Sequence, residues 1–271
     1  MLVTLISILC LLTTTEVVAE QTMHHHTPAP QFDKDKAMAI SQAAIGKTLG
    51  SYLLQKTNGE YVDLASFKGK PLIVSLIYTS CYHICPTTTQ HLNRVTKNAR
   101  QSLGDDSFNV VTIGFDVRRD NPPMMQYFAE QQNVDAENWH FLSTDEATIK
   151  SLAKQLGFLY FPSPSGFDHL VQTTLFDKEL KAYRQIYGMT FEMPLLIEPL
   201  KRMILDTSED NFAVSLSKQV LLFCTVYDPA QQKYKLDYSL FIGMFIGFMC
   251  VGVMGMQLVK EWRRTLGTKP S

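Results

Sequence analysis

The segment that most constrains this chain is residues 239–259, SLFIGMFIGFMCVGVMGMQLV, which contains no charged side chain. At about 1.5 Å per residue, a helix of these 21 residues is long enough to cross the ~30 Å hydrocarbon core of a bilayer. Tyr238 and Trp262 flank the segment, and a basic tail, residues 260–271, follows it. We therefore expect one transmembrane helix with a cytoplasmic C-terminus, because positive charge favours the cytoplasmic side. Gly243 and Gly247 form a GxxxG pair, a pattern found in some helix dimers.

A second apolar stretch begins the chain. Residues 1–19 contain a short apolar run, residues 2–12, and end in the small residues 17–19, which together indicate a signal peptide, although no Lys or Arg precedes the run. The alternative is a buried N-terminal strand. A signal peptide and a cytoplasmic C-terminus give the same topology, with the body of the protein on the exported, periplasmic side of the inner membrane. Residues 20–36 are expected to form a flexible linker. It contains three consecutive histidines, residues 24–26, which are either a weak metal-binding tract or a solvated one.

The body of the chain has the composition of a globular domain. Hydrophobic residues make up 45% of the sequence, and the net charge is −1, so neither disorder nor nucleic-acid binding is expected. We expect one domain over residues 37–210 and a tether over residues 211–238.

Strands and helices alternate along this body. Apolar runs predict strands at residues 71–78, 109–116, 139–142, 169–176 and 183–187. Helices are expected at residues 87–102, 122–132, 145–156 and 193–206. A capping box from Ser143 to Glu146 is expected to begin the third helix, and Asp120 falls in the N-cap region of the second. This alternation predicts an α/β fold with a partly parallel sheet.

Two cysteines follow the first strong strand, in residues 79–86, TSCYHICP. Cys81 and Cys85 are four residues apart beside the start of a predicted helix, where the helix dipole and free amides favour thiolates. A thiolate is both a nucleophile for disulfide exchange and a soft ligand for Cu(I). The alternative is a structural disulfide, which gains little from closing so short a loop.

The order of strand, C-x-x-x-C-P and helix resembles the Sco/SenC family of copper chaperones. Residues 115–122, FDVRRDNP, are similar to that family's F-D-P-x-R-D-T-P stretch, and residues 166–169, GFDH, are similar to the segment that carries its copper-ligand histidine. The resemblance covers residues 44–205. It implies a thioredoxin-like fold, a mixed central sheet flanked by helices, with copper held by Cys81, Cys85 and His169.

The resemblance also implies a function. A protein of this kind is a copper metallochaperone that delivers Cu(I), Cu(II) or reducing equivalents to the binuclear copper site of cytochrome c oxidase subunit II. The C-terminal extension, which contains Cys224, resembles one found in some bacterial Sco-like proteins. The alternative is a membrane-anchored thiol–disulfide oxidoreductase without a stable metal, in which Cys81 and Cys85 are the redox-active pair. His169 distinguishes the two, because disulfide exchange needs no such imidazole.

Three positions leave alternatives open. The family usually has Pro-Asp where this chain has Tyr82-His83, so His83 is a solvated side chain, a further copper ligand or a group that tunes the thiols. Cys224 is an accessory cysteine or a small apolar core residue. Cys250, inside the membrane segment, is expected to be inert packing.

Overall fold

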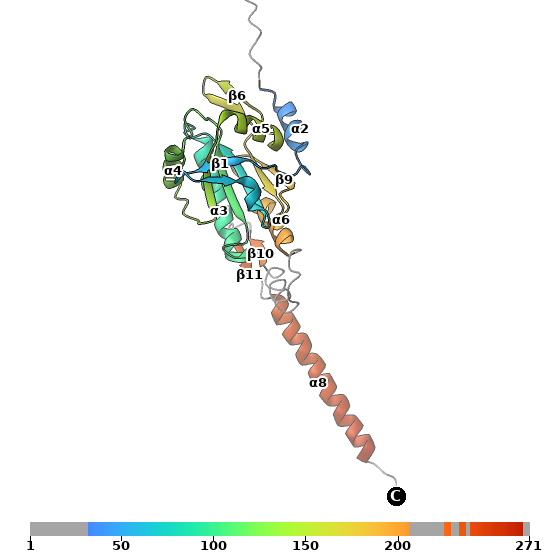
Figure 1. Ribbon diagram of the computed structural model, residues 1–271. Helices are drawn as coiled ribbons and strands as arrows, with labels where there is room; N and C mark the ends of the chain where they lie inside the picture. The colour runs from blue at the N-terminus through green and yellow to red at the C-terminus, as the bar shows by residue number, and fades with distance from the viewer. Residues whose placement is uncertain (1–31, 206–224, 229–232, 237–238, 268–271) are drawn as a thin grey trace, which may run out of the picture. The chain divides into compact units, whose positions relative to one another are not determined.

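The computed structural model describes residues 32–205, 225–228, 233–236 and 239–267 (Figure 1). Its body contains a seven-stranded sheet in the order β2-β1-β5-β4-β3-β8-β9. The strands are β1 (Leu53–Lys56), β2 (Tyr61–Asp63), β3 (Leu72–Ile77), β4 (Asn109–Gly114), β5 (Trp139–Ser143), β8 (Gln172–Phe176) and β9 (Ala182–Tyr187). A separate hairpin joins β6 (Tyr160–Ser163) to β7 (Gly166–His169).

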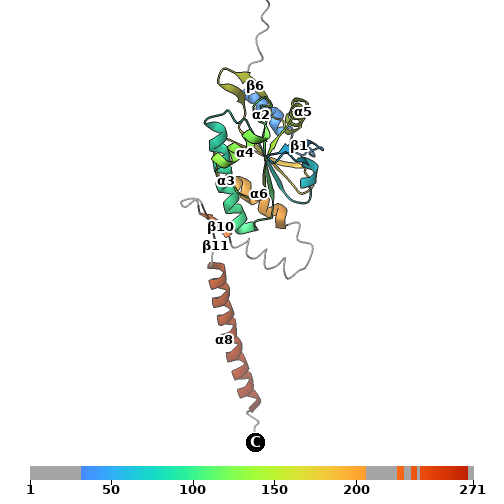
Figure 2. The same cartoon turned by 60° about the vertical axis from the view of Figure 1, so that its left-hand side comes forward.

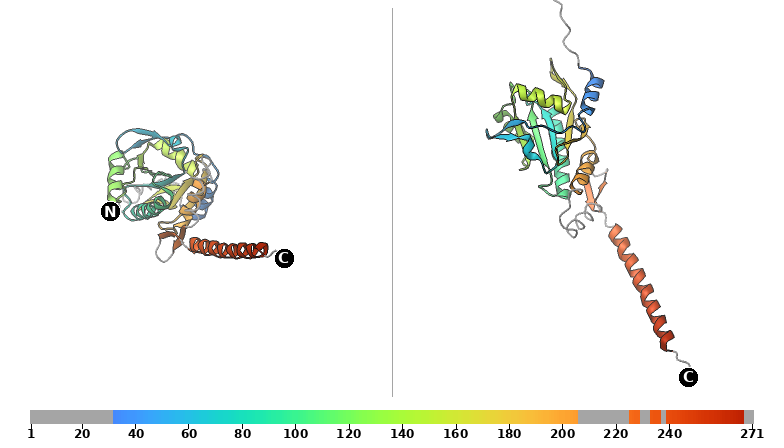
Figure 3. Two further views of the ribbon diagram at one scale, coloured as in Figure 1. Left: turned by 90° about the horizontal axis from the view of Figure 1, so that it is seen from below. Right: turned by 45° about the vertical axis from the view of Figure 1, so that its right-hand side comes forward.

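The helices of the body are α2 (Lys34–Gln42), α3 (Ile84–Leu103), α4 (Pro122–Gln131), α5 (Glu146–Leu156) and α6 (Pro194–Leu205), with a 3₁₀ turn at Leu64–Phe67. Figure 2 shows α3 and α6 side by side, in agreement with their packing contacts. Two further views show the sheet enclosed by helices (Figure 3). The fold is thioredoxin-like, a mixed sheet flanked by helices, as the family resemblance implied.

The burial of the central strands explains why these strands could be predicted from the sequence. All six residues of β3 are buried, so the strand is a continuous apolar run. β3 pairs with β4 in parallel and β4 pairs with β5 in parallel, whereas β8 runs antiparallel to β3. Ligand sites in such sheets form at the carboxyl ends of the parallel strands. The segments that follow β3 and β4 at this end, residues 78–86 and 115–121, carry the residues described below.

The predicted capping box at Ser143 was wrong, whereas helix α4 does begin in the predicted region shortly after Asp120. Helix α5 begins after Asp145, whose side chain accepts from the amides of Ala147 and Thr148. Ser143 instead ends β5, where it pairs with β1. Helix α4 is capped by Asn121, whose side chain accepts from Met124 N.

The remaining predicted elements shift by a few residues. Helix α3 begins at Ile84 rather than at residue 87, so Cys85 lies in its first turn. The expected strand at 169–176 corresponds to β8, which begins only at Gln172, and His169 instead ends β7. The β8–β9 hairpin turns near Asp177, as expected. The elements β1, β2, β6, β7 and α2 were not predicted.

The C-terminal part contains a two-stranded hairpin and one long helix. β10 (Thr225–Asp228) pairs antiparallel with β11 (Lys233–Leu236). Helix α8 (Ser239–Gly267) contains a candidate membrane span, Ile242–Arg263, with a mean hydropathy of 2.0. The expected signal peptide, the histidines at 24–26 and Cys224 lie outside the described residues. Cys250 is an exposed free thiol on α8.

Candidate metal and thiol site

The cysteine loop, residues 79–86, carries both cysteines from the end of β3 to the first turn of α3. The backbone amide of Cys85 donates a hydrogen bond to the Cys81 sulfur over 3.3 Å. His83, the N-cap of α3, makes no side-chain capping bond, so the Cys81 sulfur satisfies an amide that would otherwise lack a partner. Both cysteines are buried free thiols. The helix start therefore holds the two sulfurs together.

The two thiols differ in acidity. The pKa of Cys81 is lowered to about 4, chiefly because the Cys85 thiol donates a hydrogen bond to its sulfur. Backbone amides of Cys85 and His83 lower it further, while burial opposes them. The same thiol hydrogen bond and burial raise the pKa of Cys85 above its ordinary value. Cys81 is thus the thiolate of the pair and Cys85 keeps its proton.

Asp120 fixes the start of the cysteine loop. Its Oδ1 accepts from the backbone amide of Thr79 at 2.8 Å and from the Thr79 hydroxyl at 2.7 Å. Its Oδ2 accepts from the amide of Asp116 at 2.8 Å, so one carboxylate joins the segments after β3 and β4. Burial raises the pKa of Asp120 to about 6, although the hydrogen bonds from Thr79 oppose this. A Cβ at Gly114 would lie 2.3 Å from the Asp120 Cβ, so only glycine leaves room for this carboxylate.

His169 ends the β6–β7 hairpin and lies within an aromatic cluster. Its ring centroid is 5.2 Å from that of Phe158, 5.4 Å from that of Phe115 and 6.2 Å from that of Tyr78. Nδ1 lies 2.8 Å from the Leu170 carbonyl oxygen, which can only accept, so Nδ1 carries the proton. Nε2 therefore keeps its lone pair, the form in which histidine binds a metal. Burial lowers the pKa of His169, which also favours this neutral form.

Tyr78 connects the two regions. Its hydroxyl hydrogen-bonds the Cys81 sulfur, while its ring packs edge-on against His169 and Phe167. Burial is the main reason that the pKa of Tyr78 is raised to about 12, and the hydrogen bond to Cys81 raises it further. The phenol therefore keeps its proton and remains a donor. Gly166, at φ +120°, lets the hairpin approach: a Cβ there would lie 2.7 Å from the Tyr78 hydroxyl oxygen.

The structure assembles the predicted site residues to different degrees. Cys81 and Cys85 are in hydrogen-bond contact. His169 packs against the ring of Tyr78, which contacts Cys81. Within the described part of the chain, no three His, Cys, Asp or Glu side chains are grouped closely enough to hold a metal ion. His83 is exposed, and its backbone amide, rather than its side chain, contributes to the acidity of Cys81.

Three residues of the site were missed by the sequence analysis. Asp120 was assigned to a helix cap, and Tyr78 was taken as the last residue of a strand. Gly166 was seen only as part of the histidine motif. In the Asp-Asn-Pro sequence, Asn121 caps helix α4 and Asp120 does not. An acidic residue next to a second residue that can cap the helix was the sequence signal available for Asp120. The partners of Tyr78 and Gly166 depend on tertiary packing.

Known proteins with this arrangement were found by sequence and by structure. The SCO1/SenC family model matches residues 41–205. The SCO1 protein homolog of Bacillus subtilis is 24% identical over 148 residues, which cover 52% of this chain and 76% of that protein.

Solved structures share the fold. The structure of Bradyrhizobium japonicum ScoI with copper bound has a TM-score of 0.50 at 24% identity, covering 59% of this chain and 99% of that one. BsSco, described as a member of the Sco family of cytochrome c oxidase assembly proteins and as having a disulfide switch, has a TM-score of 0.53 at 21% identity, covering 59% of this chain and 94% of that one. The family model spans more than half of the chain, and the chain belongs to the SCO1/SenC family.

Proposed function

We propose that this protein is a membrane-anchored copper metallochaperone that delivers copper, or reducing equivalents, to the binuclear copper site of cytochrome c oxidase subunit II. The observation that carries the proposal is the thiolate–thiol pair of Cys81 and Cys85 at the start of α3, with the neutral imidazole of His169 packed against Tyr78, which hydrogen-bonds Cys81. Thiolates suit Cu(I), and an imidazole nitrogen helps to hold Cu(II).

Two thiolates and one imidazole are donor groups that copper prefers. Cys81 is ionised already, so copper needs to displace only the Cys85 proton to gain a second thiolate. The lone pair of His169 Nε2 makes no hydrogen bond among the described residues. We propose that Cys81, Cys85 and His169 together hold the copper: Cys81 and Cys85 are in contact, and the Tyr78 ring, which packs against His169, lies between the cysteine loop and the hairpin.

Family membership supports the same proposal. ScoI of Bradyrhizobium japonicum has been solved with copper bound, and BsSco belongs to a family of cytochrome c oxidase assembly proteins. We extend both properties to this chain and take subunit II as the acceptor.

A second candidate is a thiol–disulfide oxidoreductase, and the unequal acidity of the two cysteines favours it. The Cys81 thiolate would attack a partner's disulfide, releasing one partner sulfur as a thiolate and forming a mixed disulfide. Cys85, once deprotonated, would then attack the Cys81 sulfur, releasing the second partner sulfur. The partner would be reduced by two electrons and the Cys81–Cys85 pair oxidised to a disulfide. His169 has no role in this chemistry.

The experiment that separates these functions is metal analysis of the full-length protein, purified in detergent with and without reductant. We expect about one copper per chain and a thiolate-to-Cu(II) charge-transfer band. Both should be absent from the Cys81→Ser, Cys85→Ser double variant. Unchanged copper content in that variant would contradict the chaperone function. A wild type that turns over disulfides but retains no copper would support the oxidoreductase.

We further propose that α8 crosses the inner membrane once, with the C-terminal tail in the cytoplasm and Cys81 and Cys85 outside. A membrane-impermeant thiol reagent applied to intact, reduced spheroplasts should label the peptide that contains both cysteines. Labelling of that peptide only after lysis would contradict this orientation. Cys250 lies within the span and is expected to remain unlabelled in intact membranes.

A further inference from the structure

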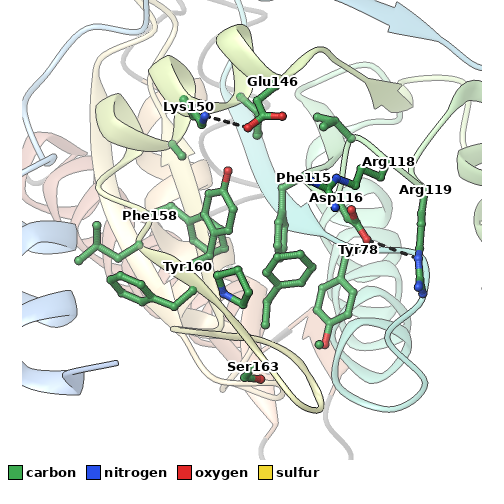
Figure 4. Close-up of a pocket in the computed structure, with 18 of the residues that line it drawn as sticks. Tyr78, Phe115, Asp116, Arg118, Arg119, Glu146, Lys150, Phe158, Tyr160 and Ser163 are labelled. Atoms are coloured by element: carbon green, nitrogen blue, oxygen red, sulfur yellow. Dashed lines mark ion pairs between the residues drawn. The ribbon is translucent and has the colours of Figure 1, made fainter. Parts of the chain in front are cut away.

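A large groove lies beside the cysteine loop. Its volume is about 1290 Å³, and it is bounded by the β6–β7 hairpin, by α2 and α5, and by the segments that follow β3 and β4. We call it the aromatic groove, because aromatic rings form its floor: those of Tyr78, Phe115, Phe158, Tyr160, Phe161 and Phe167. Figure 4 shows several of these side chains below a rim of charged residues.

The rim is basic, although the whole chain is nearly neutral. Five lining residues are Lys or Arg, and two are acidic, Asp116 and Glu146. Each acid is paired with a cation, Arg119 over 3.9 Å and Lys150 over 2.8 Å, as Figure 4 shows. The other three cations form no salt bridge within the described part of the chain: they are Lys47, Arg118 and Lys154. The rim therefore offers positive charge to an occupant.

The groove lies beside the buried Cys81, although Cys81 itself does not line it. Ser80 and Tyr82, the residues on either side of Cys81, line it, and Tyr82 is 95% exposed. Tyr78 is part of the floor and also hydrogen-bonds the Cys81 sulfur. An occupant of the groove would therefore lie next to the cysteine that we propose to carry copper.

The shape and polarity of the groove favour a peptide segment over a small molecule. Small-molecule pockets commonly measure about 300–1,000 Å³ and hold a few convergent polar groups at depth. Here the volume is larger, the floor is apolar and the charge is at the rim. None of the described lining residues has a buried polar side-chain atom without a hydrogen-bond partner. The described lining therefore offers no unpaired buried polar group to a small ligand.

We propose that the aromatic groove docks an acidic segment of the copper acceptor that also carries apolar side chains. The apolar side chains would cover the aromatic floor, and the carboxylates would meet Lys47, Arg118 and Lys154. Docking there holds the acceptor's metal site next to Cys81. This inference rests on the proposed function, and it adds the surface through which the partner is recognised.

The test uses charge reversal with a matched control. The groove variant carries Lys47→Glu, Arg118→Glu and Lys154→Glu. The control variant makes the same change of charge away from the groove, with Lys68→Glu, Lys97→Glu and Lys178→Glu; the exposed ion pairs of Lys97 with Asp135 and of Lys178 with Glu179 contribute little stability. Lys68 and Lys178 lie near the start of β3, and Lys97 lies in the second half of α3, at the opposite ends of these elements from the cysteine loop. The probe is the soluble copper domain of oxidase subunit II from the same organism.

Binding of this domain to the full-length protein is measured at low and high ionic strength, with and without copper. We expect the groove variant to lose at least ~tenfold in affinity at low ionic strength and the control variant to lose little. Copper loading should be unchanged in both. The inference is overturned if the wild type does not bind the domain, if the groove variant binds normally, or if the control variant loses as much. Affinity measured without copper keeps this outcome separate from a failure of copper loading, which would contradict the proposed function instead.

Discussion

The cysteine loop and the β6–β7 hairpin bring metal-binding side chains to one end of the sheet by different means. In the cysteine loop, four residues of chain and the first turn of α3 place the two sulfurs, and backbone amides hold one of them as a thiolate. In the hairpin, His169 is placed by aromatic rings from distant parts of the sequence, and its proton is fixed by its neighbour Leu170.

The two regions therefore differ in how far nearby residues in the sequence determine the geometry of the site. The cysteine pair depends on the local geometry of one short segment of chain. The position of the histidine depends on how the hairpin packs, and Tyr78 is the residue through which the hairpin also contacts Cys81. The four predictions below test this division, beginning with the largest expected effect.

The acidity of Cys81 should dominate thiol reactivity. In reduced wild-type protein, the alkylation rate of Cys81 should rise through a midpoint near pH 4 and stay flat to pH 8, because the thiolate is fully formed above its pKa of about 4. In Cys81→Ala, alkylation at pH 6 of the peptide containing residues 81 and 85 should fall about a hundredfold, since buried Cys85 remains a thiol. Peptide mass spectrometry measures the rate. Similar rates for the two cysteines at pH 6 would show that the loop does not prepare one thiolate.

The histidine should matter to one oxidation state of copper. His169→Ala should weaken Cu(II) binding about tenfold to a hundredfold and Cu(I) binding much less, because the thiolates alone satisfy Cu(I). Competition with chelators for each oxidation state measures the two affinities. Alkylation of Cys81 serves as the control and should be unchanged. Equal losses for both oxidation states would mean that His169 supports the cysteine loop rather than the metal.

The same division explains how much the sequence revealed. The strand, the two cysteines and the helix start are contiguous, and a fully buried β3 is visible as an apolar run. The hairpin was missed because its short strands, which contain Pro162 and Gly166, carry no clear alternation. The buried role of Asp120 was missed because its partner Thr79 lies 41 residues away, and only the parallel pairing of β3 with β4 brings them together.

Gly166 offers a way to move the hairpin at its contact with Tyr78. Gly166→Ala introduces a Cβ at φ +120° and 2.7 Å from the Tyr78 hydroxyl oxygen, which should cost about 1–3 kcal/mol of unfolding free energy. Cu(II) affinity should fall severalfold as His169 shifts. Adding Tyr78→Phe removes the closest clashing atom and should restore part of the stability, but not the part due to φ. Denaturant titration of the single and double variants measures this. Additive losses would show that the clash with Tyr78 is unimportant.

His83 is where this chain departs from the family's usual acidic residue, and its effect should be the smallest. Its backbone amide already lowers the pKa of Cys81, and any substitution except proline keeps that amide. What changes in His83→Asp is the exposed side chain. A protonated imidazole near a thiolate stabilises the anion, whereas a carboxylate destabilises it. The pKa of Cys81 should therefore rise in His83→Asp, by less than ~1 unit.

The measurement is the rate of Cys81 alkylation against pH in wild type, His83→Asp and His83→Asn. The neutral asparagine should give an intermediate curve if charge is the cause, whereas loop shape would group the two variants together. Copper stoichiometry should stay the same, because His83 is exposed and belongs to no group of three or more His, Cys, Asp or Glu side chains among the described residues. Superimposable curves would make His83 a solvated residue without a tuning role. Loss of the bound copper in both variants would instead make it a ligand, and the cysteine loop would then supply three donors without help from the hairpin.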